Sequence, residues 1–405
     1  MGLFLCILAF VAGLLLGRRS LVAGLGGVLT AGYFYGIARA NFPDSYSHFI
    51  FDAAVTGFYL ALVLSPPRAA RAAYMRPLTN WVKVLVGWSV VMFLVPVQHM
   101  LIQLVGLRGN AFLLPFLLVG GWLSAADARK LAGLLAALNV VALGFGATEY
   151  VIGIKPFYPM NAVTELLYRC GDVAGGTAYR IPACFANAAS YGGTMVVTVP
   201  WLAGAWGLRG KGLWRTLLLL GGLGGALAGT FMCASRSPVI ILAILVVAVT
   251  LSGKLRGASL LGWVVLLAVV VWVVVNEERF QRFTTLTDVD AVAGRLHGSI
   301  NMSFVELLIT YPMGNGMGGG GTSIPFFLHD LLTDPIGLES EYSRILLEQG
   351  IVGLCLWVGF VGWVALRRPT DRKDPWHFGR RLLWVSSLTA FATGMIGTGM
   401  LTSIP

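Results

Sequence analysis

Charged residues are scarce in this 405-residue chain, at 12% of the total, whereas a soluble globular protein carries about 25%. Hydrophobic residues reach 57%, and the mean hydropathy is +0.79. Many windows of roughly 17–25 residues are almost wholly apolar, which is the length that a helix needs to cross a bilayer. These runs do not alternate with polar residues as the strands of a membrane barrel do. The sequence therefore predicts an all-α polytopic membrane protein.

Acidic residues are the scarcer of the two charged classes, because 18 Asp and Glu stand against 29 Lys and Arg, which makes the formal net charge +11. A charge of this sign can indicate nucleic-acid binding, but the basic residues do not gather on one polar element. They lie between apolar runs, where the positive-inside rule places them at the cytoplasmic ends of membrane helices. We therefore expect no nucleic-acid partner.

Cysteine and histidine are also few, at five each. Cys170 and Cys184 fall in one predicted outer loop, where a disulfide between them is chemically allowed. No group of Cys, His, Asp or Glu has the spacing of a metal site, and no nucleotide-binding motif occurs. The sequence thus predicts neither a cofactor nor a metal.

Twelve membrane spans are predicted from the apolar runs. They are expected near residues 2–17, 21–38, 49–65, 81–105, 111–125, 131–151, 188–206, 215–232, 237–252, 258–275, 345–366 and 382–402. The fourth run contains Pro96, which allows a break within it. The N-terminal run is expected to be a first membrane helix, because no small-residue cleavage site follows it. The chain would form a single membrane domain over residues 1–405.

The charges of the connecting loops alternate along the chain. The basic loops carry Arg18 and Arg19; Arg68, Arg71 and Arg76; Arg129 and Lys130; Arg209, Lys211 and Arg215; Lys254 and Arg256; and Arg367 to Arg381. The basic loops are expected in the cytoplasm, which puts the acidic loops and both termini outside. Two outer loops are long, at 152–187 and 276–344. In the second, Phe304, Leu307 and Leu308 recur at helical spacing, which predicts a helix on the membrane surface that ends near Pro312.

Three arginines lie on the outer side, where the positive-inside rule does not account for them. Arg236 in "CASRSPV" can bind a diphosphate with both arms of its guanidinium, or extend to lipid headgroups. Arg180 in "AYRIPACFANAAS" pairs either with a phosphate or with an acidic residue of its own loop. Arg295 in "GRLHGS" is a further candidate phosphate ligand, and His297 beside it is either a base or a solvated loop histidine.

Two glutamates stand just before the eleventh predicted span, in "GLESEYSRILLEQGIVGL". Glu339 and Glu341 are candidate general bases for a hydroxyl, or acids that interact with the dipole of the following helix. Glu348 falls inside that span, and we expect it to pair with Arg344 at the i, i+4 spacing.

The run "GNGMGGGG" covers residues 314–321. Glycines such as Gly314 and Gly316 let a backbone adopt positive φ and approach a ligand closely. The run is not a P-loop, because no Lys-Ser/Thr pair follows it. The other interpretation is a flexible surface loop.

The order of these stretches resembles the superfamily of bacterial O-antigen ligases and O-antigen or exopolysaccharide polymerases (the Wzy/WaaL type), over roughly residues 180–353. "RIPACFANAAS" resembles its "R…G-x-F-x-N" stretch, and "ASRSP" its short "SR" turn. Arg295 followed by "PMGNGMG" resembles its loop arginine and "P-x-G-x-G". "ESEYSRILLEQGIVG" fits its closing "H/D-N-x-Y…E-x-G-x-x-G" frame. The ligase branch has a histidine where this chain has Glu339, which favours the polymerase branch.

The resemblance implies a GT-C-like glycosyltransferase of the bacterial inner membrane, with its active site facing the periplasm. It would polymerise undecaprenyl diphosphate-linked oligosaccharide repeat units without a metal. The expected catalytic residues are Glu339, Glu341, Arg236 and Arg295, and the expected substrate contacts are Arg180, His297, Gly314, Gly316 and Tyr342. The expected partners are the lipid-linked donor and acceptor, membrane lipids, and polysaccharide export or chain-length regulator proteins. The alternatives are an O-antigen ligase and a polytopic transporter or flippase of lipid-linked sugars.

Overall fold

The computed structural model describes all residues except 67–71, 170–178, 209–211, 252–303, 322–323, 334–335, 337, 339, 372 and 396–405. The described residues form helices, and no strand occurs among them. In chain order these are α1 (Gly2–Arg19), α2 (Leu21–Asn41), η1 (Ser45–Phe49), α3 (Ile50–Leu64), α4 (Ala72–Phe93), α5 (Met100–Ala111), α6 (Phe116–Trp122), α7 (Ala125–Ile152), α8 (Glu165–Arg169), α9 (Ala188–Trp206), α10 (Leu213–Met232), α11 (Arg236–Leu251), α14 (Phe304–Thr310), η4 (Phe326–Leu331), α15 (Glu341–Leu366) and α16 (His377–Thr393).

Seven helical stretches in the described part of the chain are long and apolar enough to cross a membrane. They are Gly2–Arg19, Leu21–Asn41, Ser45–Leu64, Met100–Trp122, Ala125–Ile152, Leu213–Met232 and Glu341–Leu366. This result supports the predicted all-helical, membrane-embedded protein. It does not confirm the twelve predicted spans, since those at 188–206 and 237–252 are not among these stretches. The predicted tenth span, 258–275, lies outside the described residues.

The predicted fourth and fifth spans, 81–105 and 111–125, are wrong in their bounds. Helix α4 ends at Phe93, and α5 begins only at Met100, so the expected fourth helix is broken around Pro96. Proline has no N–H to donate and its ring clashes with the preceding turn. The side chain of Gln103 donates hydrogen bonds of 2.8 Å to the carbonyls of Phe93 and Val95, which satisfies acceptors that the break releases.

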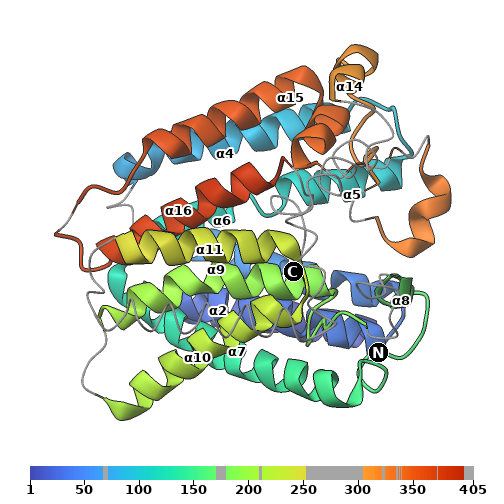
Figure 1. Ribbon diagram of the computed structural model, residues 1–405. Helices are drawn as coiled ribbons and strands as arrows, with labels where there is room; N and C mark the ends of the chain where they lie inside the picture. The colour runs from blue at the N-terminus through green and yellow to red at the C-terminus, as the bar shows by residue number, and fades with distance from the viewer. Residues whose placement is uncertain are drawn as a thin grey trace, which may run out of the picture.

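The helices lie roughly alongside one another in an elongated bundle (Figure 1). The largest apolar core joins α1, α2, α3, α7, α9, α10 and α11, and a second joins α4 to α15 through Leu85, Trp357 and Phe360. Helices α1 and α3 touch through their backbones, because a Cβ at Gly57 would lie 2.1 Å from the carbonyl oxygen of Phe10. Small residues that allow such close approach are typical of helix pairs in membranes.

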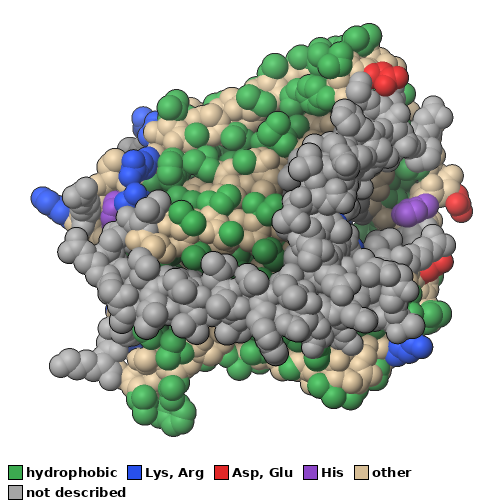
Figure 2. Space-filling model, in the orientation of Figure 1, with side chains coloured by type: hydrophobic (Ala, Val, Ile, Leu, Met, Phe, Trp, Pro, Cys, Tyr) green, Lys and Arg blue, Asp and Glu red, His purple; other side chains and the backbone are tan. Residues whose placement is uncertain are grey.

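The two ends of the bundle carry different charges. Figure 2 shows most visible Lys and Arg side chains at the end where α16 begins, and the visible Asp and Glu side chains at the opposite end. Hydrophobic side chains cover the flank between the two ends (Figure 2). We refer to these as the basic end and the acidic end. The N-terminus of α1, the C-termini of α2 and α7, and the N-terminus of α15 all lie at the acidic end (Figure 1).

Candidate functional site

Residues 179–187, which we name the Arg180 loop, are held tightly at the acidic end. A Cβ at Gly36 of α2 would lie 1.9 Å from the carbonyl carbon of Phe185, so only glycine allows this contact. The Tyr158 hydroxyl lies 2.7 Å from the carbonyl oxygens of Ala183 and Phe185. The backbone N–H of Ala183 donates a 2.9 Å hydrogen bond to Oε2 of Glu149 on α7. Contacts from three segments therefore fix the loop.

The two arginine motifs share an unusual backbone feature. Ala183 has φ 51° and Ala234 has φ 47°, and they are the positive-φ residues other than glycine in the described part of the chain. Ala183 belongs to "RIPACFANAAS" and Ala234 to "CASRSPV". An alanine in this left-handed region costs on the order of 1–3 kcal/mol, and such strain is concentrated at functional sites.

The structure brings the two motifs together. Cys233, three residues before Arg236, is fully buried against α9, since a Cβ at Gly192 would lie 2.2 Å from its Sγ. Burial raises the pKa of the Cys233 thiol to about 12, and the Arg180 guanidinium acts in the opposite direction. Because α9 begins at Ala188, directly after the Arg180 loop, the contact of Cys233 with Gly192 places the turn that connects α10 to α11 beside the start of α9. Arg236 is the first residue of α11, at the same turn.

Arg39 is a third cation of this region, which the sequence analysis did not single out. It lies in the last turn of α2 at the acidic end, and its guanidinium lies 5.4 Å from the centre of the Tyr35 ring. Its Nε is buried and has no hydrogen-bond partner among the described residues. The signal was available, because Arg39 follows an outward-running span, where the positive-inside rule does not account for an arginine.

Tyr158 and Glu149 connect Arg39 to the Arg180 loop. Burial raises the pKa of Tyr158 well above its usual value, the Glu149 and Cys184 charges raise it further, and the Arg39 guanidinium lowers it. Glu149 is 1% exposed, and its Oε1 has no hydrogen-bond partner in the described part of the chain. Cys184 carries a free, buried thiol, and Cys170 lies outside the described residues. Arg39, Glu149 and Tyr158 therefore lie in one polar region under the Arg180 loop.

A second group of expected site residues lies on the glycine run and α15. Residues 316–320 are buried, so the interpretation of this run as a flexible surface loop is wrong. Gly314 and Gly316 have φ values of 84° and 80°, as the glycine pattern predicts. Their backbone approaches protein, since a Cβ at Gly314 would lie 3.0 Å from the carbonyl oxygen of Leu347. The run is thus packed into the bundle between α5 and α15.

The expected helix around Leu307 is confirmed as α14. The chain that follows α14 packs against α15 where that helix is interrupted. Gly350 interrupts α15 with φ 68° and ψ −172°. The N–H of Ile351 donates to the carbonyl oxygen of Pro312 over 2.9 Å, and the N–H of Asn315 donates to that of Leu347 over 2.5 Å. Backbone bonds from the glycine run therefore satisfy groups that the break in α15 leaves without a helical partner.

We expect Gly106→Ala to destabilise the folded protein by about 1–3 kcal/mol, because a methyl group on α5 would overpack this contact. Its Cβ would lie 2.2 Å from the backbone nitrogen of Gly318, which cannot move like a flexible side chain. Gly109→Ala on the same helix is the matched control, since its Cβ meets nothing within 4 Å. The control should gain up to about 1 kcal/mol from helix propensity. Chemical unfolding in mixed micelles measures both, and equal stabilities would contradict the packing described.

A buried ionic network lies beside the glycine run. Arg344 donates two hydrogen bonds to Oε1 of Glu341, at 3.1 and 2.7 Å, and one of 2.5 Å to Oε2 of Glu348. This confirms the predicted pairing of Arg344 with Glu348. Asn110 of α5 donates to the same Glu348 oxygen over 2.7 Å, and the N–H of Gly320 also bonds to this carboxylate. Side chains of all three charged residues are at most 2% exposed.

Of the other residues expected at the site, two have partners within the protein and three lie outside the described residues. Glu341 is fully buried against Arg344, which gives it a structural partner, and its role as a base stays a prediction. Tyr342 donates a 3.0 Å hydrogen bond to the carbonyl oxygen of Phe391 on α16. Glu339, Arg295 and His297 lie outside the described residues.

Helix α5 connects the network to the other half of the acidic end. Arg108, two residues before Asn110, makes two 2.7 Å hydrogen bonds to the carboxylate of Asp52 on α3. The His48 ring of η1 meets the Phe327 ring of η4 edge-on at 5.5 Å. Polar and aromatic contacts therefore run across the acidic end from α3 to α15.

Comparison with known proteins gives no match, either to a protein-family model or to a curated protein.

Proposed function

We propose that this protein is a membrane glycosyltransferase that polymerises oligosaccharide repeat units linked to undecaprenyl diphosphate. The acidic end would face the periplasm of the bacterial inner membrane. The observation that carries the proposal is the meeting of the Arg180 loop with the "CASRSPV" turn. Each segment contributes one arginine, Arg180 and Arg236, at the end of the bundle where the positive-inside rule predicts none.

The proposed reaction needs cations at the leaving group. A hydroxyl of the acceptor unit attacks the anomeric carbon of the donor glycan, and the bond from that carbon to the diphosphate oxygen breaks. The departing lipid diphosphate takes the bonding electrons, so preorganised guanidinium groups lower the barrier. Arg236 and Arg180 would bind the diphosphate, with Arg295 from the large loop as a further ligand. The proton of the attacking hydroxyl would pass to a carboxylate, for which Glu339 is the first candidate and Glu341 the second.

Glu339→Gln is expected to reduce chain extension by about a hundredfold or more while the variant folds and still binds the lipid-linked carrier, because an amide cannot accept the proton. The measurement is turnover of lipid-linked repeat units alongside carrier binding. Full activity of this variant would move the role of base to Glu341 or His297.

Transport is the second candidate function, and the break in α15 is the observation that favours it. Transporters bind substrate where membrane helices are interrupted and charges lie buried. Here Gly350 interrupts α15 next to Glu348 and Arg344. We place the polymerase first because the order of motifs over residues 180–353 resembles the O-antigen ligase and polymerase superfamily.

The phenotype of cells distinguishes the candidates. Arg236→Ala in a polymerase should stop glycan chain growth while single lipid-linked units still accumulate on the periplasmic face. The same variant of a transporter would leave the units on the cytoplasmic face. A variant of a ligase would leave full-length glycan on its lipid carrier, without transfer to the final acceptor.

A further inference from the structure

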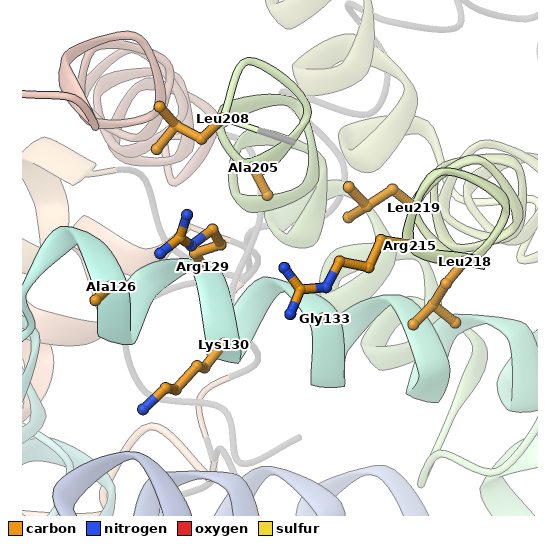
Figure 3. Close-up of a pocket in the computed structure, with 9 residues that line it drawn as sticks. All are labelled: Ala126, Arg129, Lys130, Gly133, Ala205, Leu208, Arg215, Leu218 and Leu219. Atoms are coloured by element: carbon orange, nitrogen blue, oxygen red, sulfur yellow. The ribbon is translucent and has the colours of Figure 1, made fainter. Parts of the chain in front are cut away.

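The basic end of the bundle contains a cavity that the proposed reaction does not use. Its volume is about 400 Å³, and it lies between α7, α9 and α10. Arg129, Lys130 and Gly133 of α7, Arg215, Leu218 and Leu219 of α10, and Ala126, Ala205 and Leu208 line it (Figure 3). It therefore combines three cations with an apolar wall and contains no acidic lining residue.

The cations of this cavity have no carboxylate partner among the described residues. In Figure 3 the Arg215 side chain extends from α10 toward Gly133 of α7, and Arg129 lies one turn away from Gly133 on the same helix. The Lys130 side chain extends away from both arginines (Figure 3). All three cations are exposed, and an anion between the two guanidinium groups would offset the repulsion between them.

The helix dipoles add to this positive potential. Arg129 lies five residues into α7 and Arg215 three residues into α10, so both are near helix N-termini. The N-terminus of a helix carries a partial positive charge, and basic residues there are unfavourable. The first turn of α10 has no acidic residue to offset Arg215. Helix α7 has Asp127 in its first turn, so it is α10 in particular that a bound anion would stabilise.

The walls of the cavity and the helix beside it select an amphipathic ligand. Trp214 is 83% exposed and Leu217 47% exposed on α10, next to the cavity-lining Leu218. Tryptophan is enriched where membrane helices meet the headgroup layer. An anion that is bound here thus has a hydrocarbon-facing surface directly beside it, which a free ion cannot use.

We propose that this cavity binds an anionic phospholipid of the leaflet at the basic end, with its phosphate between Arg129 and Arg215 and its acyl chains along the leucines of α10. Basic pockets between membrane helices on the cytoplasmic side are suited to such headgroups. The lipid would hold α7 against α10. The site lies at the opposite end from the Arg180 loop, so the inference does not depend on the proposed reaction.

Lipid binding to the purified full-length protein in detergent tests the site. Dioleoyl phosphatidylglycerol should raise the unfolding temperature in a saturable way, whereas dioleoyl phosphatidylcholine and inorganic phosphate should not. The double variant Arg129→Gln/Arg215→Gln should weaken phosphatidylglycerol binding about tenfold or more, because it removes two charge-assisted contacts. The double variant Arg18→Gln/Arg19→Gln at the end of α1 removes the same charge and should bind as the unaltered protein does.

A second pair of variants tests the cavity without a change of charge. Gly133 lines the cavity and a Cβ there meets nothing within 4 Å, so Gly133→Leu places a side chain in the cavity. Gly144→Leu on the same helix is its control, because a Cβ at Gly144 also meets nothing within 4 Å. Gly133→Leu should weaken phosphatidylglycerol binding and Gly144→Leu should not. Equal binding by the Arg129/Arg215 double variant would overturn the proposal. Phosphatidylcholine binding as tight as that of phosphatidylglycerol would also overturn it. The same holds if undecaprenyl diphosphate binds more tightly than phosphatidylglycerol and the same variants abolish that binding.

Discussion

Arg236→Lys is expected to lose about a hundredfold or more of the rate of glycan chain extension, with a small effect on stability. A guanidinium presents two parallel N–H donors to a diphosphate, and an ammonium group keeps the charge but not this fork. Removal of one preorganised donor from a developing anion commonly costs about 10²–10³ in turnover. Because Arg236 begins α11 at the turn that meets the Arg180 loop, the side chain has a fixed origin from which to bind the leaving group.

The control for Arg236 is Arg19→Lys, the same exchange at an exposed position at the end of α1. It should leave chain extension unchanged. If Arg180 and Arg236 bind the same diphosphate, Arg180→Lys should also reduce the rate of chain extension, as Arg236→Lys does. Unchanged turnover in Arg236→Lys, with an unfolding curve like that of the unaltered protein, would remove Arg236 from the site.

Arg344→Leu should destabilise the protein by about 3–5 kcal/mol, because it leaves two buried carboxylates without a cation. Glu341 and Glu348 are 0% and 1% exposed, and both depend on this guanidinium. The measurement is the free energy of unfolding in mixed micelles. Arg380→Leu is the matched control, since its ion pair with Asp374 is at the surface, where the Arg380 side chain is 46% exposed. Loss of a surface pair costs less than about 1 kcal/mol.

The triple variant Glu341→Gln/Arg344→Met/Glu348→Gln separates buried charge from lost packing. It removes all three charges while keeping side chains of similar size, so we expect it to be more stable than Arg344→Leu alone. A triple variant that is less stable than the single one would contradict the assignment of the cost to unpaired carboxylates. Equal stability of Arg344→Leu and Arg380→Leu would contradict the buried network itself.

The positions of several helices were predictable because hydropathy is a local property. The expected range 188–206 matches α9 at both ends, and 237–252 differs from α11 by one residue at each end. Neither helix is among the seven described stretches that are long and apolar enough to cross a membrane. The break between α4 and α5 was harder to predict, because apolar residues continue through it and only Pro96 signals the interruption. Hydropathy measures transfer into lipid and does not register where a backbone leaves the helical conformation.

The packing around the glycine run could not be predicted, because its partners are distant in the sequence. Gly106 lies more than 200 residues before Gly318, yet the two backbones touch. A glycine run carries no hydropathy pattern, so a buried loop and a flexible one look alike in sequence. Arg39 could have been found with the criterion that selected Arg180 and Arg236, whereas the buried Glu149 contact to Ala183 depends on the fold of the Arg180 loop.

The most direct test of the proposed function is polymerisation by the purified protein. Full-length protein in detergent is mixed with undecaprenyl diphosphate-linked repeat units in the presence of EDTA, and the products are separated on a gel. We expect a ladder of chain lengths that Arg236→Lys removes and Arg19→Lys retains. A single transfer to an added lipid acceptor would indicate a ligase, and no transfer by folded protein across several repeat units would contradict the glycosyltransferase proposal.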